Sequence, residues 1–126
     1  MSVVLDASAV LVLLLDEPGA EVVAPVLSES VLSAVNLAEV LSKLTDRGAD
    51  VRSLTEDLVA AGVLVEPMTV ADAAQVAELR RIDPGRLLSL GDRCCLALGR
   101  RLGLPVMTAD RAWSELAAEV DVRQIR

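Results

Sequence analysis

The sequence contains no histidine, no phenylalanine and no tyrosine among its 126 residues, and only one tryptophan. Without histidine the chain has no Ser-His-Asp or Cys-His nucleophile, no imidazole metal ligand and no imidazole acid–base catalyst. Any catalysis must therefore depend on carboxylates, Lys, Arg, hydroxyl groups or a hard metal ion held by oxygen atoms. With almost no aromatic residues, the core must consist of Leu, Val and Ala, which suits parallel strands buried on both faces.

Cysteine is also scarce. The two cysteines, Cys94 and Cys95, are adjacent within a helical pattern. Neighbouring cysteines do not form an ordinary disulfide, and two thiols without histidine make a poor zinc site. We expect both to be buried free thiols.

The sequence lacks an apolar stretch that is long enough to cross a membrane. The most hydrophobic stretch covers residues 7–15, whereas a membrane-spanning helix needs about 20 residues. The first basic residue is Lys43, and Asp6 precedes the apolar stretch, which argues against a signal peptide. We therefore expect a cytoplasmic protein without membrane contact. With 53% hydrophobic residues, the chain is long enough for a single packed domain, residues 1–126, and too short for two.

The net charge of −7 argues against nucleic-acid binding, but the charges are unevenly distributed. Residues 1–79 carry a net charge of −10, residues 80–111 carry +4 and residues 112–126 carry −1. The +4 segment contains seven arginines: Arg80, Arg81, Arg86, Arg93, Arg100, Arg101 and Arg111. These arginines form either a solvated helical face, which charge alone favours, or a local surface that faces phosphate groups.

Short apolar runs that alternate with helical patterns predict the fold class. We expect strands at residues 3–5, 31–35, 63–65, 105–108 and 122–125. We expect helices at residues 7–15, 20–27, 37–46, 51–61, 70–81, 92–102 and 111–118. Strands separated by helices indicate an α/β fold, a three-layer sandwich with a central, mostly parallel sheet of 4–5 strands flanked by helices.

Two aspartates are expected at one edge of this sheet. Asp6 follows the first strand directly, and Asp110 follows the fourth strand by one residue. The carboxyl ends of parallel strands meet at one edge, where open α/β sheets bind ligands. Taken alone, each aspartate is explained more simply as the N-cap of the next helix.

Two further acids, Glu39 and Asp92, belong to the first turns of predicted helices. Asn36 and Glu39, like Ser89 and Asp92, have the N-cap and N3 spacing of a capping box. The same spacing recurs in residues 69–72, to which we assign no chemistry. Capping and metal binding are compatible, because one carboxylate oxygen can serve each purpose.

The four acids indicate a metal site only when they are taken together. Four acids at one edge repel one another and raise one another's pKa unless a cation neutralises them. Carboxylate oxygens select hard ions, so Mg²⁺ or Mn²⁺ is expected, and such ions activate water and offset charge on a phosphodiester. The hydroxyl groups of Ser8 and Thr108 either orient these acids and bind water on the metal, or make ordinary turn hydrogen bonds.

At these positions the sequence resembles the PIN-domain family. The resemblance rests on residues 3–9 (VVLDASA), on Asn36 and Glu39, on residues 88–93 (LSLGDR) and on residues 106–113 (VMTADRAW). It is strongest to the VapC-type toxins of bacterial toxin–antitoxin systems and covers essentially the whole chain. The motifs are short individually and specific together.

The resemblance implies a PIN fold and an endoribonuclease that depends on Mg²⁺ or Mn²⁺. It assigns the family's acidic quartet, as catalytic residues and metal ligands, to Asp6, Glu39, Asp92 and Asp110, with no departure at any of the four positions. It also implies a homodimer and inhibition by a cognate VapB-type antitoxin.

Three other side chains have competing explanations. Arg93 and Arg111 each follow one of the four acids, and we expect them to contact RNA phosphates, with salt bridges to those acids as the alternative. Trp113 either stacks on a base or, as we favour, anchors the last helix in the core. The apolar faces within residues 22–61 either receive an antitoxin segment or belong to the core.

Other classes of protein share parts of this pattern. A phospho-receiver domain would need a phosphorylatable aspartate after the third strand and a late lysine, but that strand ends in Glu66-Pro67 and the only lysine is Lys43. A non-catalytic PIN-like interaction domain is disfavoured by the complete set of four acids. A PIN-domain RNA-processing nuclease outside a toxin–antitoxin pair stays open as an alternative.

Overall fold

The central sheet is parallel throughout. We describe it from a computed structural model, in which residues 2–116 and 120–126 are described. Within these ranges the sheet has five strands in the order β3-β2-β1-β4-β5, and each pairing is parallel. The strands are β1 (Val3–Leu5), β2 (Ser30–Ser33), β3 (Leu64–Glu66), β4 (Val106–Thr108) and β5 (Val122–Gln124). The predicted mostly parallel sheet is therefore confirmed.

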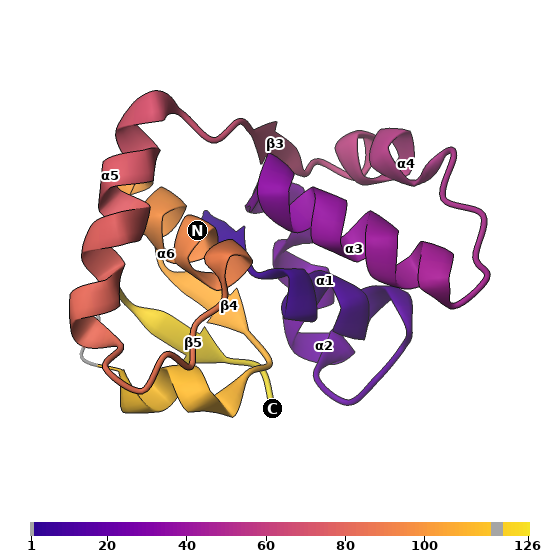
Figure 1. The fold of residues 1–126 in the computed structure, drawn as a ribbon. Coiled ribbons are helices and arrows are strands. Elements are labelled where there is room, and N and C mark those ends of the chain that lie inside the picture. The colour runs from indigo at the N-terminus through magenta and orange to yellow at the C-terminus, as the bar shows by residue number, and fades with distance from the viewer. Residues whose placement is uncertain (1, 117–119) are drawn as a thin grey trace.

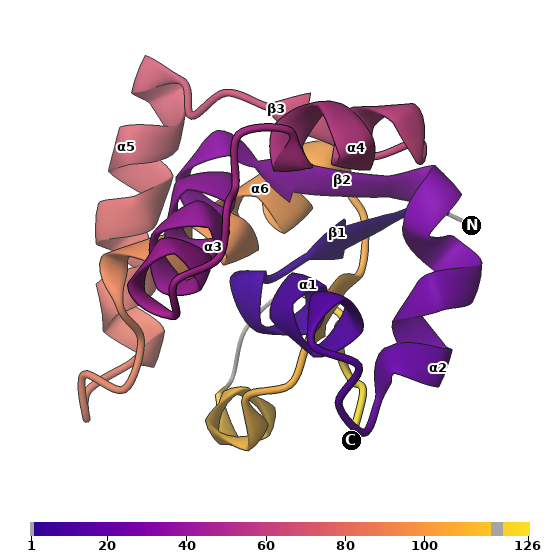
Figure 2. The ribbon, with the colours of Figure 1, turned by 90° about the vertical axis from the view of Figure 1, so that its right-hand side faces the viewer.

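Helices lie on both sides of the sheet. The α-helices are α1 (Ala7–Leu14), α2 (Ala20–Val23), α3 (Ala34–Asp46), α4 (Leu54–Ala60), α5 (Val70–Glu78) and α6 (Leu90–Leu102). Short 3₁₀ helices are η1 (Ala24–Glu29), η2 (Leu79–Ile82) and η3 (Arg111–Glu115). In Figure 1, α1 to α4 lie on the right and α5 and α6 on the left, and Figure 2 shows β1 beside β2. Across the described ranges, no helix combines the length and hydropathy of a membrane span.

The side chains of β1 alternate between two cores. Val3 and Leu5 pack into one core with residues of α1 and α3, whereas Val4 packs into a second core with residues of α6. Consecutive side chains of a strand point to opposite faces, so a strand covered on both sides must be apolar at every position. The uninterrupted apolar run of β1 follows from this three-layer arrangement.

The second core contains the single aromatic residue and both cysteines. Trp113 is only 1% exposed, which confirms the prediction that it is an anchor and leaves its indole ring no surface on which a base could stack. Cys94 and Cys95 are buried free thiols, as predicted. Burial raises the pKa of both thiols.

The apolar faces of residues 22–61 belong mainly to the first core. Val23, Val40 and Leu58 are buried there, whereas Val22 and Val59 are exposed. The core interpretation therefore holds for most of this segment, and a few exposed side chains are left for other contacts.

Some helix boundaries differ from the prediction. The helix predicted at residues 20–27 becomes 3₁₀ after Val23, where Pro25 cannot donate a backbone hydrogen bond. The helix predicted at residues 111–118 is the shorter 3₁₀ helix η3, and its predicted residues 117 and 118 lie outside the described residues. Helix α3 begins three residues before its predicted start, because Ser33 Oγ accepts the Val35 N–H at 3.2 Å and caps the helix.

The strand order changes direction between β1 and β4. From β1 the chain proceeds to β2 and β3 on one side, and it then returns to β4 and β5 on the other side. In open α/β sheets, ligands bind beyond the carboxyl ends of the two strands at such a switch. Asp6 and Asp110 follow those two ends.

Candidate active site

Asp6 lies at the centre of this edge, directly after β1. Its side chain is only 3% exposed and makes no capping hydrogen bond to α1. Asp6 Oδ2 instead accepts hydrogen bonds from Ser8 Oγ at 2.7 Å and from Thr108 Oγ1 at 3.0 Å. Helix capping therefore does not account for a buried carboxylate at this position.

The hydroxyl groups of Ser8 and Thr108 connect the end of β1 to the end of β4. Their oxygens lie 3.2 Å apart. Ser8 Oγ accepts the Ala109 N–H at 2.9 Å, and Thr108 Oγ1 accepts the Asp110 N–H at 3.0 Å. Both hydroxyl groups thus orient Asp6, and they also make turn hydrogen bonds to residues 109 and 110, so the two sequence-based explanations hold together. Contact of either hydroxyl group with substrate stays a prediction.

Asp110 is exposed at the start of η3. Its Oδ1 accepts the Ala112 N–H at 3.0 Å, so this aspartate does serve as an N-cap. Gln124 Nε2 donates to the Asp110 carbonyl at 2.8 Å. Sequence reasoning missed Gln124, because only the register of β5 against β4, which pairs Thr108 with Gln124, brings it here.

Glu39 comes from the second turn of α3, not from the first turn as predicted. Because α3 begins at Ala34, Asn36 lies inside the helix and is not its N-cap. The fully buried Asn36 instead donates through Nδ2 to Glu39 Oε1 at 2.7 Å and to the Gly91 carbonyl at 3.1 Å. Glu39 is thereby joined to the first turn of α6, which also carries Asp92.

Asp92 forms the predicted capping box with Ser89. Asp92 Oδ2 accepts the Ser89 N–H at 2.9 Å, and Ser89 Oγ accepts the Asp92 N–H at 3.1 Å. The capping hydrogen bond uses Oδ2, so Oδ1 can interact with a cation.

Burial and neighbouring acids raise the pKa of two of these carboxylates, Asp6 and Asp92. Burial raises the pKa of Asp6 to about 6, the Ser8 hydrogen bond opposes this shift, and the charge of Asp92 adds to it. Burial also raises the pKa of Asp92 against its hydrogen bonds with Ser89, and the charges of Glu39 and Asp110 raise it further. Asp92 therefore lies within electrostatic range of Asp6, Glu39 and Asp110 at this edge of the sheet.

These acids do not enclose a metal ion by themselves. Among residues 2–116 and 120–126, no three His, Cys, Asp or Glu side chains lie close enough to hold one. Mg²⁺ is usually bound through one or two carboxylates and keeps several water molecules. The donors here are hard oxygen atoms, and a cation beside them would oppose the burial and the Asp92 charge that raise the pKa of Asp6. The residues thus fit a hydrated hard cation.

Arg93 requires a correction. Its side chain is only 7% exposed, and Nη1 donates to the Val76 carbonyl at 2.9 Å. Helix α6 turns this residue toward α5, so the guanidinium satisfies a buried backbone carbonyl. A direct contact of Arg93 with RNA phosphate, as predicted, is incompatible with this position.

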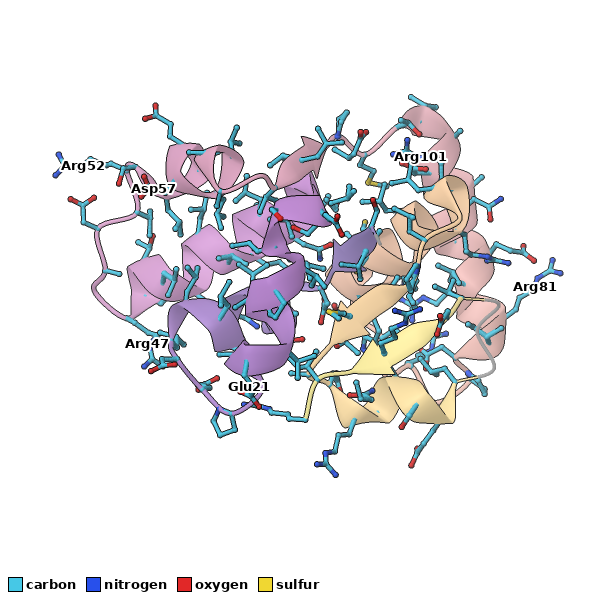
Figure 3. The ribbon with its side chains drawn as sticks, turned by 180° about the vertical axis from the view of Figure 1, so that it is seen from behind. Glu21, Arg47, Arg52, Asp57, Arg81 and Arg101 are labelled. Carbon is cyan, nitrogen blue, oxygen red and sulfur yellow. The ribbon has the colours of Figure 1, made fainter. Side chains whose placement is uncertain are left out.

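The seven arginines of residues 80–111 do not form one face. Arg101 pairs with Asp72 at 3.1 Å, and Arg81 pairs with Glu78 at 3.4 Å. Figure 3 shows the labelled Arg81 and Arg101 side chains well separated. Arg111 is exposed and follows the fourth acid directly, and its contact with RNA phosphate stays a prediction.

The sheet order and the acidic edge place the chain in a class of α/β proteins that gather carboxylates where the strand order reverses. The family model of the PIN domain matches residues 3–119. The chain therefore belongs to the PIN-domain family, which confirms the resemblance seen in the sequence. No curated protein matches the sequence.

Several solved structures share the fold. FitAcB from Neisseria gonorrhoeae has a TM-score of 0.70 at 22% identity and covers 98% of this chain and 97% of its own. DNA-bound VapBC from Salmonella typhimurium has a TM-score of 0.74 at 14% identity, with 100% and 99% covered. VapC20 from Mycobacterium tuberculosis, described as a Sarcin-Ricin loop cleaving toxin, has a TM-score of 0.64 at 21% identity, with 89% and 92% covered. These likenesses extend over nearly the whole fold.

Proposed function

We propose that this protein is the endoribonuclease toxin of a toxin–antitoxin pair and hydrolyses RNA phosphodiester bonds with Mg²⁺ or Mn²⁺. The observation that carries the proposal is the convergence of Asp6, Glu39, Asp92 and Asp110 at the carboxyl edge of β1 and β4. Membership of the PIN family supports nuclease activity. The description of VapC20 as a Sarcin-Ricin loop cleaving toxin supports RNA as the substrate.

In this proposal the four acids attract a hydrated cation, which one or two of them would bind directly. The bound cation would supply an activated water molecule and offset charge on the scissile phosphate. Ser8 and Thr108 keep Asp6 in place through hydrogen bonds to a single oxygen, Oδ2. Asp92 likewise uses one oxygen, Oδ2, for its cap and keeps Oδ1 for the site. The acids are thus oriented by the protein before substrate arrives, which lowers the cost of assembling the site.

A protein partner belongs to the same proposal. One similar structure is described as a toxin–antitoxin complex from Klebsiella pneumoniae, and another, VapBC-5 from Mycobacterium tuberculosis, as a member of the VapBC family of toxin–antitoxin systems. We therefore propose a VapB-type antitoxin as the inhibitor of this chain, a homodimer as its own assembly and the cytoplasm as its location.

The proposal is tested with purified protein that is free of antitoxin. RNA should be cleaved when Mg²⁺ or Mn²⁺ is present and should stay intact in EDTA, and sequencing of the cleaved ends would identify the preferred site. Cleavage that continues in EDTA would contradict a metal-dependent nuclease. RNA binding without cleavage in either cation would favour a non-catalytic interaction domain.

Arg111 offers a separate test of substrate contact. Removing one phosphate contact should weaken RNA binding and reduce the slope of log K against log salt by about 1. We therefore expect Arg111→Ala to show this change in a binding titration at several salt concentrations, made with Asp92→Asn protein so that the RNA stays intact.

Arg52→Ala is the matched control for this test, because Arg52 is also exposed but pairs with Asp50 at 2.6 Å within the acidic part of the chain. Its salt dependence should equal that of the parent protein. Equal slopes for the Arg111 and Arg52 variants would remove Arg111 from the RNA contacts.

A further inference from the structure

Gly91, the residue before Asp92, lies directly against the carboxylate of Glu39. A Cβ atom at Gly91 would collide with Glu39 Oε1 and would lie 2.6 Å from Cδ and 2.8 Å from Oε2. Real Cβ atoms do not approach other atoms so closely. While Glu39 keeps this position, only glycine fits at residue 91.

The backbone of Gly91 gives no other reason for a glycine. Gly91 lies in the first turn of α6 and is not among the glycines with positive φ, so any residue could adopt its conformation. Glycine inside a helix costs about 1 kcal/mol relative to alanine. The space that Glu39 occupies accounts for this unfavourable choice.

Asn36 holds the same carboxylate through its side-chain amide. Both of its Nδ2 hydrogen bonds serve this contact, one to Glu39 Oε1 at 2.7 Å and one to the Gly91 carbonyl at 3.1 Å. Asn36 is fully buried, so water does not compete for these hydrogen bonds. The Glu39 carboxylate therefore accepts a hydrogen bond from the buried Asn36 amide of α3 and lies against the backbone of Gly91 in α6.

We infer that Gly91 and Asn36 are positioning residues that place the Glu39 carboxylate beside Asp92. The inference deepens the proposed function and rests on it where cation binding is concerned. With Oε1 bound to Asn36, Oε2 is the Glu39 oxygen that is left for a cation. Gly91 thus leaves room for the Glu39 carboxylate, and Asn36 orients it by a hydrogen bond. Glu39 belongs to α3, whereas Asp92 belongs to α6.

Gly91→Ala separates positioning from folding. The atoms that the new methyl group would meet are the far end of a flexible side chain, so Glu39 can swing away at small cost. Alanine is also the better helix former. The variant should therefore stay folded while its Glu39 carboxylate is displaced, because the helical gain of alanine offsets part of the lost Asn36 hydrogen bond.

Mn²⁺ binding, followed by electron paramagnetic resonance, measures the consequence. Loss of a group that orients a metal ligand typically costs 10–100-fold in metal affinity, so we expect a loss of about that size in Gly91→Ala. If Gly91 acts through Glu39, the double variant with Glu39→Gln should bind Mn²⁺ no more weakly than Glu39→Gln alone. Gly85→Ala is the control, because the nearest atom to its added Cβ is Leu87 Cγ at 3.8 Å.

A second readout needs no metal. In ¹⁵N–¹H spectra of the metal-free protein, the side-chain amide signals of Asn36 should shift in Gly91→Ala, because Nδ2 loses its Glu39 acceptor, and should stay in place in Gly85→Ala. Unmoved Asn36 signals, unchanged Mn²⁺ affinity or additive losses in the double variant would each overturn the inference. Wild-type protein that binds no Mn²⁺ would instead count against the proposed function, and the Asn36 signals would still decide whether Gly91 positions Glu39.

Discussion

Asp92→Asn is expected to lower RNA cleavage roughly 10³-fold, because losing one ligand of the catalytic cation removes about 4 kcal/mol of transition-state stabilisation. The substitution removes the charge but keeps the helix cap. Asp92 Oδ2 accepts the Ser89 N–H, and the amide oxygen of asparagine can accept the same hydrogen bond. The loss should therefore appear in kcat/KM on a fluorogenic RNA and not in the far-UV circular dichroism spectrum.

Asp72→Asn is the matched control for this prediction. Asp72 forms the same capping box, with Thr69 at the start of α5, but it pairs with Arg101 and lies outside the four acids. Its variant should cleave RNA at the wild-type rate per folded molecule. If Asp92→Asn kept a tenth or more of the activity, or if both variants lost activity equally, capping and not chemistry would explain Asp92.

The sheet was predictable because each strand is marked by a short apolar run in the local sequence, and this pattern recurs several times along the chain. The apolar run of residues 3–5 is typical of a parallel strand covered by helices on both faces, and each predicted strand overlaps an observed one. The start of α3 was not predictable, since Ser33 and Asn36 are both good N-caps. Packing of α3 against α6 through the buried Asn36 decided between them.

The acidic site was predictable in composition and only partly in geometry. Asp6 and Asp110 follow strand ends, so the parallel sheet alone brings them to one edge. Contacts such as that between Asn36 and Gly91 join residues 55 positions apart, and no local pattern encodes them. The prediction that Arg93 contacts RNA failed for a related reason. The count of charges in a segment does not reveal which face of α6 packs against α5.

The buried charge of Asp6 should make the metal-free protein less stable as the pH rises. The pKa of Asp6 is raised from 3.8 to about 6, mainly by burial, so the folded state favours the protonated acid. Its contribution to the free energy of unfolding is therefore fully present below 3.8 and is lost as the pH rises to about 6. A shift of this size corresponds to about 3 kcal/mol. The stability contribution of Asp72 has the opposite pH dependence. Burial raises its pKa, but hydrogen bonds with Thr69 and the charge of Arg101 outweigh burial and lower its pKa overall.

Asp6→Asn removes this ionisation, so we expect it to raise the free energy of unfolding by up to about 3 kcal/mol near pH 7.5 and by little near pH 4. Urea unfolding in EDTA measures both values, and Asp72→Asn should destabilise the protein near pH 7.5. An Asp6→Asn protein that is less stable than the wild type at both pH values would mean that the hydrogen bonds from Ser8 and Thr108 compensate the charge fully. Mg²⁺ should stabilise the wild type more than Asp6→Asn, because the variant lacks the charge of one of the four proposed acids. Asp6 would then destabilise the metal-free fold and be stabilised by the bound cation, which is the trade-off expected where a charge is buried for function.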